Sequence, residues 1–301
     1  MANQKKNVTT SAFIVQYLGS SGYLKWMSDK MYLKLLYRTS MGVKLNLDNP
    51  QRYTEKLQWI KLYDRRDDYT MMADKYAVRK YVADTIGEEY LIPLIGVWDR
   101  PEDIDFSSLP EKFVMKCNHD SGGIIICKDK AKLDVEKTRK YLAERLKLNF
   151  FWAAREWPYK NIKKKIIAEK FMVDESGYEL KDYKFFCFDG KCQAVFIATD
   201  RGVDTKFDFF DTDFNHLPIK NGHENADKPI KKPQAWNEMI DLAEKLSVGI
   251  PQVRVDLYDV FGHPYFGEMT FFHWGGKKPF EPDKWDFTFG SWITLPDKRK
   301  L

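Results

Sequence analysis

The sequence contains few cysteines and no long apolar run. Its four cysteines are Cys117, Cys127, Cys187 and Cys192. They form no Cys-x-x-Cys pair and no His/Cys ligand spacing, which favours reduced thiols in a cytosolic protein. Because Gly19 to Gly22 interrupts the N-terminal apolar residues, we expect neither a signal-peptide core nor a membrane span. These absences predict a soluble, non-secreted protein.

A strong charge of one sign is also lacking. The chain has 49 Lys and Arg against 44 Asp and Glu, a formal net charge of +5. This excess is too small to indicate nucleic-acid binding, although it favours anionic ligands. With 301 residues, of which 44% are hydrophobic, the chain can bury a sizeable core as two domains or as one larger layered domain.

The most informative stretch is a predicted β-hairpin between Gln252 and Gly276. Apolar and polar residues alternate from Val253 to Tyr258, which is the pattern of a half-buried strand. After a turn around Gly262, the return strand from 264 to 270 is expected to place Phe266, Glu268 and Thr270 on a single face.

Asp256 and Glu268 are the charged pair of this hairpin. If they lie opposite each other, their carboxylates are about 5 Å apart, and a bridging Mg²⁺ would offset their repulsion. The alternative is that both acids face solvent. Opposed antiparallel residues have numbers with a constant sum, and the sum for this pair is even. The hairpin therefore needs either a loop with an odd number of residues or a β-bulge.

Helical and strand periodicity divide the rest of the chain. Helices are predicted at residues 23–38, 54–63, 71–86, 133–149 and 236–246, and strands at 91–98, 112–116, 124–127, 166–168, 180–188 and 194–198. Residues 203–233 are expected to be a loop. The helix at 23–38 is cationic and amphipathic, with Leu24, Met27, Met31 and Leu35 as its apolar face. It could lie on an anionic membrane, but we expect it to pack on the neighbouring domain.

A glycine-containing turn, Asn118 to Gly123, connects two of the predicted strands. Its backbone N–H groups could cover phosphates. No Gly-Lys-Ser/Thr follows, so it is not a Walker loop. A plain hairpin turn is the alternative.

The order of these pieces from about Met71 to Gly276 resembles the ATP-grasp superfamily. Five segments are similar to its TupA-like branch, which is associated with teichuronopeptide and other cell-surface polysaccharide biosynthesis: NPQRYTEKLQWIKLY, ADKYAVRKYV, VMKCNHDSGG, LKDYKFFCFDGK and VRVDLYDVFGHPYFGEMTF. The resemblance implies an α+β ATP-grasp fold. A helical segment at 1–70 would precede an ATP-grasp domain at 71–301, with a lid at about 112–172 and a metal-carrying core at about 173–301.

The resemblance also implies a site for ATP and Mg²⁺, with Mn²⁺ as an alternative metal. The expected nucleotide contacts are Lys75, Lys116, the flap residues His119, Ser121, Gly122 and Gly123, the adenine-binding segment Glu169, Lys170, Phe171 and Met172, and Glu179 for the ribose. The expected metal ligands are Asp256, Glu268 and Thr270, the last standing where the superfamily usually has asparagine. The expected catalytic residues are Arg254, which steadies the transferring phosphate, and Lys184 and Arg201, which contact phosphate or substrate.

The implied activity is an ATP-dependent carboxylate–amine ligase that works through an acylphosphate. It would join an amino acid or amino sugar to a uronic acid or similar carboxylate in polysaccharide, for example capsule, biosynthesis. The glycan would be a small molecule or lipid-linked, and the protein would be cytoplasmic or at the inner face of the membrane. About 70 helical residues precede the ATP-binding part, so the resemblance transfers no substrate site. The alternatives are a glycan kinase with Asp182 or Asp120 as base, and a non-catalytic nucleotide-binding protein.

Overall fold

The computed structural model describes residues 2–177, 180–200 and 204–298. The helices of this part are α1 Ala2–Ser20, α2 Asp29–Met41, α3 Tyr53–Tyr63, α4 Asp67–Ala73, α5 Val78–Thr85, α6 Val135–Lys147, α7 Phe151–Ala154, α8 Trp236–Ser247 and α9 Lys284–Trp292. The strands are β1 Leu94–Trp98, β2 Phe113–Cys117, β3 Ile124–Cys127, β4 Ile166–Lys170, β5 Asp182–Phe188, β6 Lys191–Thr199, β7 Lys206–Phe210, β8 His216–Leu217, β9 Val253–Val260 and β10 His263–Thr270.

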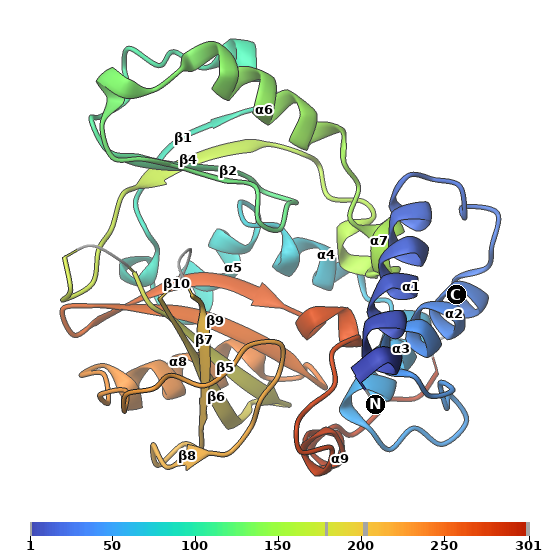
Figure 1. Ribbon diagram of the computed structural model, residues 1–301. Coiled ribbons are helices and arrows are strands. Elements are labelled where there is room, and N and C mark those ends of the chain that lie inside the picture. Colours follow the sequence, from blue (N-terminus) through green and yellow to red (C-terminus); the bar gives the residue numbers. More distant parts are fainter. Residues whose placement is uncertain (1, 178–179, 201–203, 299–301) are drawn as a thin grey trace.

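A small antiparallel sheet with the order β1-β4-β2-β3 has a hydrophobic core of its own. Phe113, Met115 and Ile166 are fully buried there against Leu142 of α6, which lies on the outer side of the sheet (Figure 1). Asp134 begins α6 as predicted, because its carboxylate accepts the backbone N–H of Lys137 at 2.9 Å. The small sheet and its core extend N-terminally beyond the expected lid range, since they include β1 and Ile104.

The large sheet has the order β10-β9-β5-β6-β7-β8 and lies below the small sheet in Figure 1. Helix α8 covers one of its faces. The helix presents Met239, Leu242 and Leu246 to the strands, and all three are buried. This is the amphipathic pattern that the sequence predicts for residues 236–246.

The opposite face of the large sheet is polar toward β10 and aromatic toward β7. The aromatic part is packed edge to face, with ring centroids of Phe186 and Phe289 5.1 Å apart and those of Tyr53 and Phe289 5.8 Å apart. Helices α3 and α9 therefore cover only the aromatic half. The polar half is left facing the small sheet.

The hairpin β9–β10 contains a bulge. A two-residue turn, Phe261 and Gly262, joins Val260 to His263, and the register shifts between Phe266 and Glu268. The register prediction is therefore confirmed through the bulge rather than through an odd loop. The predicted face of Phe266 is wrong, because this residue pairs with Leu257 and is buried on the apolar side.

The predicted helix at 23–38 begins later than expected. Ser28 caps α2 by accepting the N–H of Met31 at 3.4 Å, and the chain turns between 21 and 27. The buried face consists of Tyr32, Leu33, Leu36 and Tyr37. Met31 and Leu35, expected to be buried, are exposed. The helix does pack on the protein, as predicted.

Three further differences from the predicted elements concern single segments. The helix predicted at 71–86 is broken, because the Asp74 carboxylate accepts the N–H groups of Tyr76 and Ala77. The region predicted as a loop contains β7 and β8. Helices α7 and α9 were not predicted, and α1 lies in the segment 1–70 that is expected to be helical, although no bounds were predicted for it. No helix in the described ranges combines the length and apolar character that a membrane crossing requires.

Candidate active site

Charged side chains from three strands meet on the polar face of the large sheet. Arg254 and Asp256 of β9 form a two-point ion pair with N–O distances of 2.6 and 2.7 Å. Lys184 of β5 lies 2.5 Å from the same carboxylate. Glu268 of β10 is the direct cross-strand partner of Asp256, so the expected metal pair shares one face.

Lys75 joins this cluster from outside the sheet. Its Nζ lies 3.0 Å from Glu268 Oε2 and donates to the backbone carbonyl of Asp120 at 2.8 Å. Its backbone N–H donates to the carbonyl of Asn118 at 3.1 Å. Lys75 therefore connects Glu268, an expected metal ligand, to the flap of the small sheet. A cation at this position is suited to contact phosphates bound between the large sheet and the flap.

Thr270 lies inside the same network. Its hydroxyl accepts from Arg254 Nη2 at 3.0 Å and lies 3.3 Å from Glu268 Oε1. Asp182, two residues before Lys184, lies 3.3 Å from the Lys184 ammonium. The network thus contains three cations and three carboxylates, whose formal charges cancel. They are Lys75, Lys184, Arg254, Asp182, Asp256 and Glu268.

The electrostatics keep Glu268 and Arg254 charged. Burial alone would raise the pKa of Glu268, but Lys75, Lys184 and Arg254 outweigh burial and hold it well below its usual value. Burial would lower the pKa of Arg254, but Asp256 and Glu268 outweigh it in the same way. The mutual attraction of Glu268 and Arg254 therefore outweighs the cost of their burial.

The residues present fit a hard divalent cation. In the described part of the chain no group of three or more His, Cys, Asp and Glu residues could hold a metal by itself. Asp256 and Glu268 supply two carboxylates, with the Thr270 hydroxyl beside them. Mg²⁺ commonly takes one or two carboxylates and completes its shell with waters and substrate phosphates, so this donor set suits Mg²⁺ brought with ATP.

His273 is a member of the site that sequence reasoning missed. Arg254 Nη1 lies 2.7 Å from His273 Nδ1, and His273 Nε2 lies 2.8 Å from Asn221 Oδ1. A guanidinium can only donate, so Nδ1 accepts and Nε2–H donates to Asn221. Burial, together with Arg254 and Lys184, lowers the pKa of His273 well below its usual value. A lone histidine between aromatic residues carries no spacing signal that could have revealed it.

The small sheet carries a second charged cluster. Lys116 of β2 lies 2.7 Å from Glu169 Oε2, and Arg79 of α5 lies 3.5 Å from Glu169 Oε1. Two of the expected nucleotide contacts, Lys116 and Glu169, are therefore neighbours. They lie on the small sheet, on the neighbouring strands β2 and β4.

The flap is anchored more firmly than the sequence suggests. His119 and Asp120 are buried, and a two-point ion pair holds Asp120 to Arg145 of α6. The His119 side chain therefore does not cover the site, and the exposed tip consists of Ser121 and Gly122. Gly123 has no room for a side chain, because a Cβ there would lie 2.0 Å from Asp120 Oδ2.

The segment expected to bind adenine begins where β4 ends. Glu169 and Lys170 are its last strand residues, and Phe171 and Met172 continue it half-buried without regular structure. The backbone N–H of Lys170 donates to the carbonyl of Pro93 at 3.0 Å. Glu179 and Arg201 lie outside the described residues.

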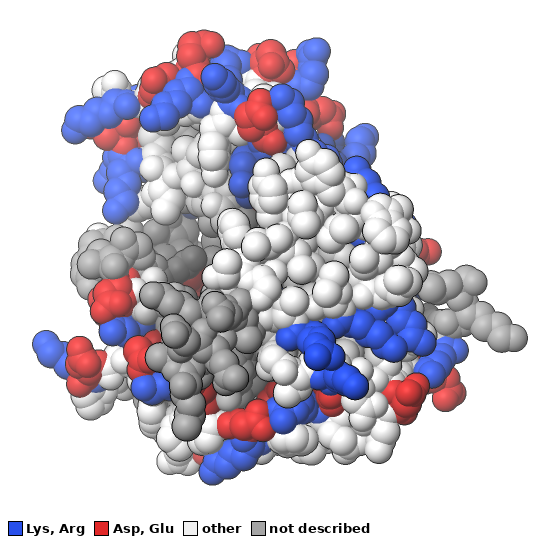
Figure 2. All heavy atoms as spheres, turned by 45° about the vertical axis from the view of Figure 1, so that its right-hand side comes forward, with Lys and Arg blue, Asp and Glu red and all other residues white. Residues whose placement is uncertain are grey.

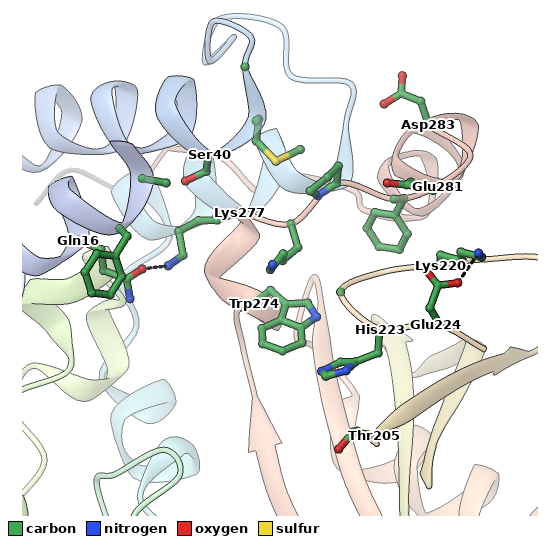
Figure 3. A pocket seen from close by; sticks show the side chains of 18 of the residues that line it. Gln16, Ser40, Thr205, Lys220, His223, Glu224, Trp274, Lys277, Glu281 and Asp283 are labelled. Atoms are coloured by element: carbon green, nitrogen blue, oxygen red, sulfur yellow. Dashed lines mark hydrogen bonds and ion pairs between the residues drawn. The ribbon is translucent and has the colours of Figure 1, made fainter. Parts of the chain in front are cut away.

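A hollow of about 1140 Å³ is lined by Trp274, the neighbour of His273 in the sequence, and by His223 and Lys277 (Figure 3). Trp274 and His223 lie side by side in its wall, with ring centroids 6.0 Å apart. Lys277 points to Gln16 of α1 and donates to its Oε1 at 2.6 Å. Lys278 lies 5.9 Å from the Trp274 ring.

The hollow is tied to the charged cluster through Asn221. The Asn221 Oδ1 accepts from His273, and its Nδ2 donates to the carbonyl of Pro279 at 3.0 Å. Because Pro279 lines the hollow, one hydrogen-bonded chain runs from its wall to Arg254.

The chain is similar to a known protein family and to several solved structures. A family model described as TupA-like ATPgrasp matches residues 55–294. No curated protein matches the chain. Among solved structures it is similar to a Bacillus anthracis D-alanine–D-alanine ligase complexed with ATP, with 16% identity, 66% of this chain and 53% of that chain covered, and a TM-score of 0.38.

Two further similar structures are a Helicobacter pylori D-alanine–D-alanine ligase and the ATP-grasp ligase PsnB with Mg and ADP. The first has 13% identity, covers 82% of this chain and 70% of that chain, and has a TM-score of 0.43. The second has 10% identity, covers 84% and 65%, and has a TM-score of 0.42. The chain spans about half the length of the Bacillus anthracis enzyme. Because the family model covers most of its residues, the chain belongs to the TupA-like ATP-grasp family, with the α+β fold of that superfamily.

Proposed function

We propose that this protein is an ATP-dependent carboxylate–amine ligase. The observation that carries the proposal is the convergence of Lys75, Lys184 and Arg254 on the Asp256–Glu268 pair. Three fixed cations around two carboxylates form a place where phosphate charge can be held and transferred. Such a site favours phosphoryl transfer by positioning and needs no protein nucleophile.

The reaction proceeds in two steps. An acceptor carboxylate oxygen attacks the γ-phosphorus of ATP, and the bond from that phosphorus to ADP breaks, which leaves an acylphosphate. An amine nitrogen then attacks the acyl carbon, the bond from carbon to the phosphate oxygen breaks, and orthophosphate leaves as the nitrogen loses a proton. Arg254 is placed to stabilise charge in both steps, while Lys75 and Lys184 hold the phosphates. Mg²⁺ or Mn²⁺, held by Asp256 and Glu268, would neutralise the phosphate charge.

We propose an acidic saccharide, such as a uronic acid unit of a glycan under assembly, as the carboxylate, and an amino acid or amino sugar as the amine. The hollow supports this choice. Trp274 offers an aromatic surface that is 37% exposed, and Lys278 beside it offers a cation for a carboxylate. The hydrogen bonds through His273 connect this hollow to Arg254. The role in cell-surface polysaccharide synthesis, in the cytoplasm where ATP is present, rests on the family.

A glycan kinase is the rival function, and it needs a base beside the acceptor hydroxyl. Asp120 is held by two contacts to Arg145, and Asp182 lies against Lys184. Both carboxylates are thus occupied by cations, which disfavours the kinase. A non-catalytic role is disfavoured because the residues that the family resemblance assigns to ATP and metal converge on one site.

The fate of the γ-phosphate tests the proposal. With γ-labelled ATP, Mg²⁺, a uronic acid and an amino acid, we expect label in free orthophosphate in step with ADP and amide. Hydroxylamine should trap the activated acyl group as a hydroxamate. Label that stays on the glycan without any amine dependence would establish the kinase instead, and ATP binding without turnover on any acceptor would favour the non-catalytic protein.

A further inference from the structure

The outer side of the N-terminal helices exposes large apolar side chains. On α1, Phe13, Ile14 and Tyr17 share one helical face and are 70%, 51% and 58% exposed. In the turn before α2, Tyr23 and Trp26 are 69% and 76% exposed. We call these five residues the N-terminal apolar surface. Scattered exposed apolar residues are ordinary, but a contiguous group on one element indicates an interaction site.

Within residues 10–47, the stretch that carries this surface, the charges are almost all positive. Between residues 10 and 47 the cations are Lys25, Lys30, Lys34, Arg38 and Lys44, and the one acid is Asp29. The Asp29 carboxylate is already paired, with Arg65 at 2.5 Å and Arg155 at 3.0 Å. The five cations are exposed. Charge complementarity with this stretch therefore favours an anionic partner.

The cations alternate with apolar residues on the outer face of α2. Lys30, Lys34 and Arg38 follow one another at helical spacing, and Met31 and Leu35 lie in the adjacent row. The inner face of the same helix is buried in the core, so the outer face remains free to bind. Figure 2 shows a continuous area of uncharged side chains on this side of the molecule, with Lys and Arg side chains along its edge.

We propose that the N-terminal apolar surface docks on an anionic lipid bilayer. Aromatic side chains such as Trp26 and Tyr23 prefer the headgroup level of a membrane. Lysines on long stems lie beside them and attract anionic headgroups. A protein partner would be expected to bring defined pockets and acids, whereas interleaved aromatics and lysines on a helix and its flanking turn are the pattern of an interfacial helix. The contact is peripheral, since α1 and α2 also pack on the protein.

The docking surface adjoins the hollow of Figure 3. Phe13 belongs to both, and Ser40, Met41 and Gly42 at the end of α2 also line the hollow. A bilayer at this surface would therefore present a glycan carried by a lipid directly to the hollow. Docking itself does not depend on the ligase activity, so the two proposals fail separately.

Vesicle flotation of the full chain tests the docking. We expect the protein to float with vesicles of phosphatidylcholine mixed with phosphatidylglycerol, to remain unbound with phosphatidylcholine alone, and to be released by salt. Lys30→Gln with Lys34→Gln should weaken binding about fivefold per lysine. Tyr23→Ser with Trp26→Ser should abolish it, with thermal unfolding unchanged.

Two variants serve as matched controls. Lys80 and Lys132 are equally exposed lysines elsewhere, with 83% and 84% of their side-chain surface accessible. Phe261 is an exposed aromatic on the distant hairpin turn, 69% accessible. Lys80→Gln with Lys132→Gln, and Phe261→Asn, should float like the wild type. The proposal is overturned if the wild type does not float, if the controls lose binding equally, or if Tyr23 and Trp26 instead hold a dimer together in sedimentation.

Discussion

Asp256 lies directly opposite Glu268 because Gly267 is inserted between Phe266 and Glu268 as a bulge. The two-residue turn of the hairpin by itself would place Gly267 opposite Asp256 and Glu268 opposite Val255, on the apolar face. With the bulge, Glu268 returns to the polar face beside Arg254. One extra residue thus decides whether the two carboxylates can share a ligand.

Replacing Gly267 should damage the site through this bulge. A Cβ at this position would lie 3.0 Å from the carbonyl oxygen of Asp256 and 3.0 Å from the Tyr258 ring. We expect Gly267→Val to lower the free energy of unfolding by about 1–3 kcal/mol, as for other overpacked positions, and to reduce ATP turnover. Urea unfolding measures the first effect. Tyr265→Val, a β-branched change at a half-exposed position on the same strand, is the control and should cost much less.

The sequence predicts the strands of the hairpin but not the faces of all their residues. The alternation from Val253 to Tyr258 is a local pattern, so β9 was predicted correctly. The prediction for the face of Phe266 is wrong because a bulge depends on backbone pairing, which the alternation of residue types does not reveal. A glycine inside a strand was the available signal.

Contacts between distant segments could not be predicted from local patterns. Lys75 reaches Glu268, and His273 reaches Arg254 and Asn221, only because the fold brings them together. Resemblance to the superfamily indicated Lys75, whereas His273 lies outside the five segments that carry the resemblance. The buried face of α2 was missed for a related reason, since the helix begins at Asp29 rather than at Tyr23.

Asp256 and Glu268 should differ in how their loss affects stability. Asp256 is 1% exposed between Arg254 and Lys184. Asp256→Ala removes the shortest ion-pair contacts of Arg254 and Lys184 and leaves them only the longer contacts to Glu268 at 3.7 Å and Asp182 at 3.3 Å. The change is expected to cost about 3 kcal/mol of folding free energy. Glu268 is 34% exposed, so Glu268→Gln should cost less folding free energy than Asp256→Ala, and the protein should still fold.

Turnover assays should separate the catalytic role of Glu268 from its contribution to stability. Glu268→Gln is expected to abolish Mg²⁺-dependent ATP turnover while the protein remains folded, and excess Mn²⁺ should restore only part of the activity. Turnover assays and thermal unfolding in parallel make the comparison. Unchanged turnover in Glu268→Gln would remove Glu268 from the metal site.

The stability contributed by Glu268 should depend on pH in one direction. Its pKa is held below the usual value in the fold by Lys75, Lys184 and Arg254, which outweigh burial. A carboxylate with a lowered folded pKa stabilises fully above its unfolded pKa, about 4.3, and this stabilisation is lost as the pH falls through the folded pKa. The difference in unfolding free energy between wild type and Glu268→Gln should therefore be constant above about pH 5 and shrink below about pH 4. A difference that stays level to pH 3 would contradict this charge network.

The hollow should control acceptor binding and, through His273, the rate of transfer. Trp274→Ala removes the aromatic surface, which contributes on the order of 1–2 kcal/mol. We expect the KM for an acidic saccharide to rise about tenfold, with the KM for ATP unchanged, because Lys75 and Lys116 lie outside the hollow.

Replacing His273 should instead affect the rate of transfer. His273→Phe removes the acceptor of Arg254 Nη1 and lowers kcat with little change in either KM, and His273→Gln, which can still accept that hydrogen bond, should recover part of the rate. Steady-state kinetics with ATP and saccharide varied separately, and Phe261→Asn as a control for an exposed aromatic, measure all of these. If Trp274→Ala raised both KM values equally, the hollow would not be the acceptor site. A loss of kcat that His273→Gln does not relieve would mean that His273 stabilises the fold rather than positions Arg254.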